Sequence, residues 1–175
     1  MGCDIHSHAE VKRPDGTWRN VGKIFPVNGP IWAGIIKSDF EEPFYPRNYG
    51  VFGFLANVRN YSCVTPIAEP KYAIPEDAAP ETQRAYEEWE GDAHSASWLT
   101  LEQLLAVDYS TIAWNRRVMK QTAPKCWNGA ALAEEGEGTH ESLRDFLGEL
   151  FFAHLETLKT LGKPEDVRVV FWFDN

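Results

Sequence analysis

Residues 3–11 read Cys-Asp-Ile-His-Ser-His-Ala-Glu-Val, and small or apolar side chains alternate with ionisable ones along the whole stretch. Because successive side chains of a β-strand point to opposite faces, this pattern predicts a strand with one apolar and one polar face. Pro14, Asp15 and Gly16 form a turn signal directly after it, and residues 17–25 are expected to return as a second strand. The expected fold is built outward from this N-terminal hairpin.

The C-terminal part of the chain carries the clearest helix, followed by an apolar strand. Leucines at three- and four-residue spacing predict a helix from about 140 to 161, in which His154 is expected to be a hydrogen-bonded core residue. Residues 167–173 form an apolar run that fits a central strand, and we expect it to pair with the first strand. These elements predict an α+β fold, in which a small, mostly antiparallel sheet carries helices packed on one side.

Shorter helices are predicted between the hairpin and the long helix. Apolar residues at helical spacing predict one over residues 51–58, and Pro80 suits the first turn of another. Thr100 and Gln103 form a capping box in front of a third. The prolines of residues 66–80 forbid regular structure there and predict an ordered surface crossing or a lid rather than a domain boundary. We therefore expect a single domain over residues 1–175.

The composition restricts the classes of partner. The chain has 175 residues and a net charge of −9, so non-specific binding of nucleic acid is disfavoured. No run approaches the roughly 20 apolar residues that cross a bilayer, so no membrane association is expected. The cysteines Cys3, Cys63 and Cys126 are odd in number and far apart, which favours reduced thiols and a cytoplasmic location. The sequence leaves a homo-oligomer open.

The polar face of the first strand concentrates metal-ligand side chains. Asp4, His6, His8 and Glu10 alternate along it, roughly 6.5–7 Å apart. Two imidazoles and a carboxylate at this spacing can converge on one divalent ion, as hydrolytic metal sites require, and the ion could be Zn²⁺, Mn²⁺ or Mg²⁺. The alternative is the solvated outer face of an antiparallel sheet. We predict a metal site that uses Asp4, His6 and His8.

A second acid–histidine pair lies before the capping box. Asp92 and His94 fall in a Ser-rich segment that we expect to be a loop, where ligand-binding and catalytic groups are common. Asp92 would complete the metal shell and His94 would supply a catalytic group. The alternative is a turn aspartate and an exposed histidine. Asp174 ends the last strand and is expected to reach the same face if that strand neighbours the first.

Two triplets with the sequence Arg-Asn-Tyr lie 12 residues apart, at 47–49 and 59–61. Arginine can clamp a phosphate, asparagine can read a base edge and tyrosine can stack, so the triplets suit a nucleotide site. The alternative is a chance repeat that flanks a helix. The residues are Arg47, Asn48, Tyr49, Arg59, Asn60 and Tyr61. We expect the arginines to offset phosphate charge and the other four to bind the nucleotide.

Residues 4–8, Asp-Ile-His-Ser-His, resemble the first metal motif of the PHP phosphoesterases and the amidohydrolases. In those families a strand-borne His-x-His binds divalent metals for hydrolysis. The chain is too short for their barrels, and the Ser-Asp-Gly that often follows in PHP proteins is missing. The resemblance therefore implies shared local chemistry and not a shared fold.

Over a longer span the chain is similar to small phage and prophage proteins. Their shared segments are Met-Gly-Cys-Asp-Ile-His, Arg-Asn-Tyr-x-x-Phe-Gly, a Pro-rich crossing and His-Ser-x-Ser-Trp-Leu-Thr. Here these are Met1–His6, Arg47–Gly53, Pro66–Pro80 and His94–Thr100. The resemblance implies a viral protein of the host cytosol. By analogy with phage proteins that destroy or sequester nucleotide immune signals, it favours a nucleotide ligand and an anti-defence role.

The sequence supports three functional hypotheses. We favour a metal-dependent hydrolase, a phosphodiesterase that acts on a small nucleotide. The first alternative is a non-catalytic, nucleotide-binding sponge that uses the Arg-Asn-Tyr triplets. The second is a protein that binds a host protein through the acidic surface between about Glu76 and Asp92.

Overall fold

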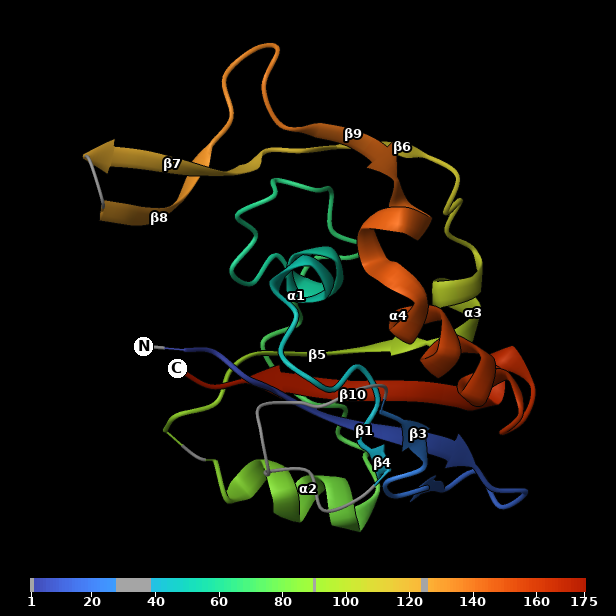
Figure 1. Ribbon diagram of the computed structural model, residues 1–175. Coiled ribbons are helices and arrows are strands. Elements are labelled where there is room, and N and C mark those ends of the chain that lie inside the picture. The colour runs from blue at the N-terminus through green and yellow to red at the C-terminus, as the bar shows by residue number, and fades with distance from the viewer. Residues whose placement is uncertain (1, 28–38, 90, 124–125) are drawn as a thin grey trace. The chain divides into compact units, whose positions relative to one another are not determined.

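The computed structural model describes residues 2–27, 39–89, 91–123 and 126–175 (Figure 1). The strands are β1 (Ile5–Lys12), β2 (Trp18–Asn20), β3 (Phe25–Pro26), β4 (Phe40–Glu41), β5 (His94–Thr100), β6 (Ile112–Asn115), β7 (Arg117–Ala123), β8 (Cys126–Leu132), β9 (Thr139–Ser142) and β10 (Val167–Phe173). The helices are α1 (Tyr49–Ala56), α2 (Pro80–Glu87), α3 (Leu101–Leu105), α4 (Leu143–Lys159) and the 3-10 turn η1 (Pro164–Asp166). No helix of these residues is long and apolar enough to cross a bilayer.

The chain divides into two compact units that are interleaved in sequence. Unit 1 contains Met1–Asn48, Pro70–Val107 and Glu149–Asn175, and unit 2 contains Tyr49–Glu69 and Asp108–Gly148. This division does not test our expectation of a single domain over residues 1–175, which stays a prediction. Each unit is described separately below.

The central sheet of unit 1 has the strand order β2-β1-β10-β5, and its neighbouring strands are antiparallel. The last strand pairs with the first, as expected, with Ile5 opposite Phe173 and Val11 opposite Val167. Every residue of β10 is buried, which fits an apolar strand between two neighbours. The α+β class with a mostly antiparallel sheet is confirmed.

The N-terminal hairpin is confirmed, although its second strand is shorter than expected. The amide of Arg13 donates to the carbonyl of Thr17 at 2.7 Å, and Asp15 Oδ1 accepts from the amide of Thr17 at 2.9 Å. Gly16 takes a φ of +86°, which favours glycine. Pairing of β2 with β1 ends at Asn20, opposite Glu10, so the chain turns away before reaching the histidines.

Helices of unit 1 lie on both sides of the sheet, whereas we expected them on one side. In Figure 1, α2 lies on one side, and α3 and the second half of α4 lie on the other. Pro80 begins α2 as predicted, and the capping box of Thr100 and Gln103 begins α3. His154 of α4 is a core residue as predicted: Nδ1 accepts from the amide of Phe44 at 2.7 Å, and Nε2 lies 2.8 Å from the carbonyl of Pro26.

The long helix predicted from 140 to 161 is shorter and interrupted. It begins at Leu143, and Gly148 inside it has a φ of 77° and a ψ of 167°, which are not helical values. Leucine periodicity continues through this position and therefore conceals the break. The boundary between the two units falls at this glycine.

Unit 2 combines α1 with two strand pairs, β6 with β9 and β7 with β8. The predicted helix over 51–58 is observed as α1, and its residues from Val51 to Ala56 are buried. Gly53 packs directly against Asn60, whose amide holds the following loop through the backbone of Val64. An alanine Cβ at Gly53 would lie 2.7 Å from Asn60 Oδ1, so the helix requires a glycine there.

Candidate functional site

The structure separates the four polar residues of the first strand. Asp4 precedes β1 and is half-buried, as are His6 and His8, whereas Glu10 is fully buried. The two histidines line a pocket in unit 1, and Glu10 lies outside it in an ion pair. The polar face predicted from the sequence is therefore divided between two roles. Its two histidines line a candidate ligand site, and Glu10 stabilises the fold.

The candidate site is a pocket of about 530 Å³ over the first half of β1, which we call the β1 pocket. Its volume falls in the range of small-molecule sites. Its acidic and basic lining residues are Asp4, His6, His8, Lys23, Glu41, Glu42 and Glu88. Its aromatic lining residues are Tyr45, Trp89 and Trp172. A cavity of this size that combines titratable groups with aromatic rings is a reasonable place for chemistry on a small ligand.

His6 is oriented by the end of the last strand. Its Nε2 lies 3.2 Å from Asp174 Oδ2, and the other oxygen of Asp174 accepts from the amide of Asp4 at 2.9 Å. The His6 ring also packs on Trp89, with ring centroids 4.1 Å apart. When Nε2 donates to the carboxylate, Nδ1 keeps its lone pair. Metal-binding histidines in proteins are commonly oriented by a carboxylate in this way.

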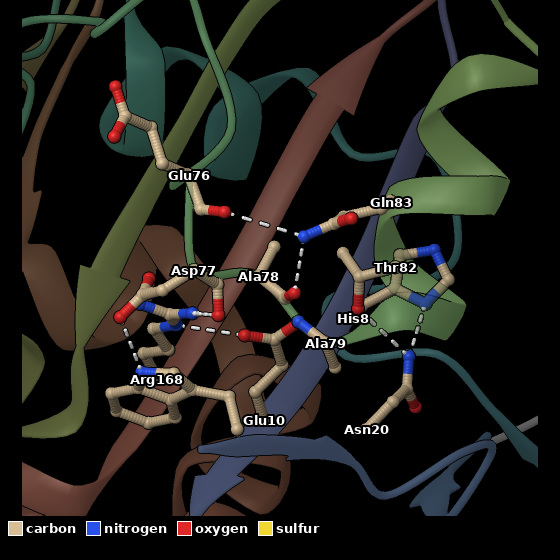
Figure 2. A network of polar contacts seen from close by, with 11 residues as sticks. His8, Glu10, Asn20, Glu76, Asp77, Ala78, Ala79, Thr82, Gln83 and Arg168 are labelled. Carbon is tan, nitrogen blue, oxygen red and sulfur yellow. Dashed lines mark hydrogen bonds and ion pairs between the residues drawn. The ribbon is translucent and has the colours of Figure 1, made fainter. Parts of the chain in front are cut away.

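His8 lies deeper than His6 and has a different set of partners. Asn20 Nδ2 lies 2.9 Å from His8 Nδ1 (Figure 2). The His8 ring stacks on Trp172, with ring centroids 5.2 Å apart. Burial, with smaller contributions from the charges of His6 and Lys23, lowers the pKa of His8 to about 4. His8 is therefore neutral at physiological pH.

Glu42 supplies a carboxylate that no sequence pattern singled out. Burial raises its pKa to about 7, and the neighbouring charge of Glu41 acts in the same direction. Its Oε2 is buried and has no hydrogen-bond partner among the described residues. The charge of Lys23 opposes this rise in the pKa of Glu42, although Lys23 itself is bound to Glu41 at 2.7 Å. A buried carboxylate oxygen without a partner is costly in free energy when the group is charged, and a cation or a proton would stabilise it.

Asp4 and Arg47 form a two-pronged ion pair at one end of the pocket. Arg47 Nε donates to Asp4 Oδ1 at 2.7 Å and its terminal nitrogen donates to Oδ2 at 2.6 Å. This contact lowers the pKa of Asp4. The guanidinium lies so close to Gly2 that a Cβ there would fall 2.2 Å from it. Both side chains must rearrange before Asp4 can bind a metal or Arg47 a phosphate, and those two predicted roles stay predictions.

Glu10 belongs to a buried network that holds the Pro-rich crossing (Figure 2). Its Oε2 accepts from Arg168 Nε at 2.8 Å, and its Oε1 accepts from the amide of Ala79 at 2.8 Å. Arg168 also donates to Asp77 Oδ1 at 2.8 Å and lies 3.8 Å over the ring of Trp18. Both carboxylate oxygens of Glu10 therefore form hydrogen bonds that stabilise the fold.

Asp92 and His94 do not line the β1 pocket. His94 is the first residue of strand β5, opposite Phe173, and not part of the loop that we expected. Its Nδ1 lies 3.0 Å from Ser95 Oγ, and its Nε2 is buried with no partner among the described residues. Asp92 is exposed in the turn that follows Trp89. The predicted catalytic and metal-binding roles of this pair gain no support from their positions.

The Arg-Asn-Tyr triplets are brought together only in part. Arg59 lies 3.4 Å from the hydroxyl of Tyr61, and the Tyr61 ring lies 5.8 Å from that of Tyr49. Asn60 is occupied by the loop at Val64, as described above, and Asn48 is exposed. Arg47 contacts Asp4, a lining residue of the β1 pocket.

No three side chains of the described residues form a ready-made metal site. Of the predicted ligands, His6 has the most suitable surroundings, and Glu42 adds an oxygen without a partner. Sequence reasoning missed Glu42 and Trp89, because they come from segments with no pattern that links them to the first strand. It also missed Lys23, which lies in the segment expected to return along the first strand but is singled out by no pattern there. It did identify Asp174, from the expected pairing of the end strands.

The chain matches no protein-family model, no curated protein and no solved structure.

Proposed function

We propose that the protein is a metal-dependent hydrolase, a phosphodiesterase that acts on a small nucleotide in the β1 pocket. The observation that carries the proposal is the meeting, in one cavity, of the carboxylate-oriented His6, the neutral His8 and Glu42, whose Oε2 has no partner among the described residues. These groups suit metal binding, hydrogen bonding and proton transfer.

The charge of the pocket favours a divalent cation. Its lining has four carboxyl groups and one lysine, and that lysine is already paired with Glu41. Such a pocket repels a phosphodiester until a cation is bound. His6 Nδ1 and Glu42 Oε2 are the ligands that we assign. A mixed imidazole and carboxylate ligand set suits Zn²⁺ or Mn²⁺ better than Mg²⁺, and such an ion can complete its shell with water and phosphate oxygens.

The aromatic lining supports a nucleotide as the ligand. Trp89 lies at the pocket beside His6, and an indole is a good platform for stacking a base. A divalent ion held by His6 and Glu42 would activate a water for attack on phosphorus; the bond to the leaving oxygen would break, and the proton lost by the water would pass to that oxygen.

Turnover measurements test the proposal. The probes are bis(4-nitrophenyl) phosphate and a panel of cyclic mono- and dinucleotides, each with MnCl₂ or MgCl₂. We expect His6→Ala and Glu42→Gln to reduce turnover by about 100-fold or more. Asp174→Asn should weaken metal binding by about 10–100-fold. The matched control is Glu156→Gln, in an exposed ion pair of α4.

Elemental analysis of protein purified without chelator or histidine tag complements the kinetics. Full turnover by metal-free protein would overturn the metal-dependent reaction. Loss of activity in Glu156→Gln equal to that in His6→Ala would show that the assay measures something other than this pocket.

A second candidate is a non-catalytic nucleotide-binding protein, and one observation in unit 2 favours it. Tyr61, which is 39% exposed, has Arg117 at 5.8 Å over its ring and Arg59 near its hydroxyl. An exposed ring beside two guanidinium groups suits a base with its phosphate. Release of an intact nucleotide on heat denaturation, abolished by Tyr61→Ala, would support this function over hydrolysis.

A further inference from the structure

The hydrogen bonds around Asn20 determine where its amide nitrogen lies. The backbone amide of Gly22 donates to Asn20 Oδ1 at 2.7 Å, so that atom must be the carbonyl oxygen. The Nδ2 group then points to His8 Nδ1 at 2.9 Å and to the buried Thr82 Oγ1 at 3.2 Å (Figure 2). An amide nitrogen can only donate. The orientation of Asn20 is therefore set by the backbone.

This orientation of Asn20 determines which nitrogen of the His8 ring carries the proton. Since Nδ2 of Asn20 donates, His8 Nδ1 must accept, and it carries no proton. A doubly protonated ring would place two donors against each other at 2.9 Å. The neutral ring therefore carries its proton on Nε2. Stacking on Trp172 at 5.2 Å holds the plane of the ring.

A ring nitrogen that bears a proton cannot bind a metal. His8 lines the β1 pocket, and its Nε2 lies on the side of the ring away from Asn20 (Figure 2). Binding of a metal at Nε2 would require the proton to move to Nδ1 and the Asn20 amide to turn over. The turned amide would bring its NH₂ group against the amide of Gly22, 2.7 Å away. The local hydrogen bonds thus oppose the metal-binding form of His8.

We propose that Asn20 is a positioning residue that holds His8 as a neutral Nε2–H donor, and that His8 binds an anionic oxygen of the substrate. This inference rests on the proposed function, and it divides the two histidines between two tasks. His6 faces a carboxylate acceptor and is left with a free lone pair for the metal. His8 faces an amide donor and is left with a proton for a phosphate oxygen. The substrate class that follows is an oxyanion, presented beside the metal.

The tautomer can be measured without substrate or metal. Long-range ¹⁵N–¹H correlation spectra of the wild-type protein at pH 7 should show His8 with its proton on Nε2. In Asn20→Asp the carboxylate can only accept, so the proton should move to Nδ1. A wild-type spectrum with the proton on Nδ1, or on both nitrogens, would overturn the inference. The wild-type measurement is decisive even if the variant folds poorly.

Metal and phosphate titrations test the division of tasks. Mn²⁺ binding, followed by electron paramagnetic resonance, should be lost in His6→Ala and changed less than about threefold in His8→Ala. Inorganic phosphate with MgCl₂ should shift the His8 Nε2 signal of the wild type. Loss of Mn²⁺ binding in His8→Ala, or an unmoved Nε2 signal, would overturn the donor role. If the wild type binds no Mn²⁺ while His8 shows the Nε2–H tautomer, the proposed hydrolase fails and the role of Asn20 stands.

Discussion

Glu10 and Arg168 lie directly opposite each other on the two central strands and form a buried ion pair, with Glu10 fully buried and Arg168 5% exposed. Strand register brings them together, and the amide of Ala79 and the carboxylate of Asp77 complete their hydrogen bonds. The pair therefore joins the sheet to the segment that leads into α2, which covers the histidines of the β1 pocket.

Removing one partner of this pair should destabilise the protein strongly. Glu10→Ala leaves the guanidinium of Arg168 buried beside an empty space, and we expect the free energy of unfolding to fall by about 3–5 kcal/mol. Urea denaturation measures this change. The control is Glu156→Gln in the exposed Lys159–Glu156 pair, which should change stability by less than about 1 kcal/mol. Equal losses of stability in the two variants would show that the buried Glu10–Arg168 pair contributes no more than an exposed ion pair.

Glu42→Gln should stabilise the protein at alkaline pH. The pKa of Glu42 is about 7 in the fold and 4.5 as a model value, so the folded state binds its proton more tightly. Its contribution is therefore fully present below pH 4.5 and is lost as the pH rises through 7. At pH 8 the variant, which has no charge to bury, should have the higher melting temperature, and the difference should shrink at pH 5. A variant that is less stable at pH 8 would contradict this account.

His154 should make the protein sensitive to acid. Burial lowers its pKa below the model value of 6.5, so its contribution to stability is present above pH 6.5 and is lost as the pH falls. His154→Leu leaves two backbone groups without partners, each costing about 1–3 kcal/mol at pH 7, and it should flatten the dependence of stability on pH below 6.5. Denaturant midpoints between pH 7 and 5 measure both effects. His140→Leu, at an exposed site, is the control.

Gly53→Ala should destabilise α1, although alanine is the better helix former. The added methyl would lie 2.7 Å from Asn60 Oδ1 and would displace the side chain that holds the loop at Val64. We expect a loss of about 1–3 kcal/mol in thermal or chemical denaturation. Gly162→Ala is a matched control, because its Cβ would meet Val167 at 3.5 Å, an ordinary contact. A stable Gly53→Ala protein would show that the loop can move without cost.

The sequence by itself determined the elements whose signals are local. Alternation over residues 3–11, the turn at Pro14–Gly16 and the apolar run at 167–173 were sufficient for the hairpin and the central strand pair. Once those end strands pair, the proximity of Asp174 to His6 follows from their antiparallel register. Periods of two and of 3.6 residues are properties of neighbouring positions, which is why they can be read directly.

Only the tertiary structure decided what covers the polar face of β1. Glu42 and Trp89 arrive from segments far along the chain, and no period in the sequence relates them to His6. Alternation also could not distinguish His6 from His8, because both lie on one face at equal spacing. Their difference comes from Asp174 beside one and Asn20 beside the other. The physical reason is that hydrogen-bond partners and burial are long-range properties, set when the covering segments pack.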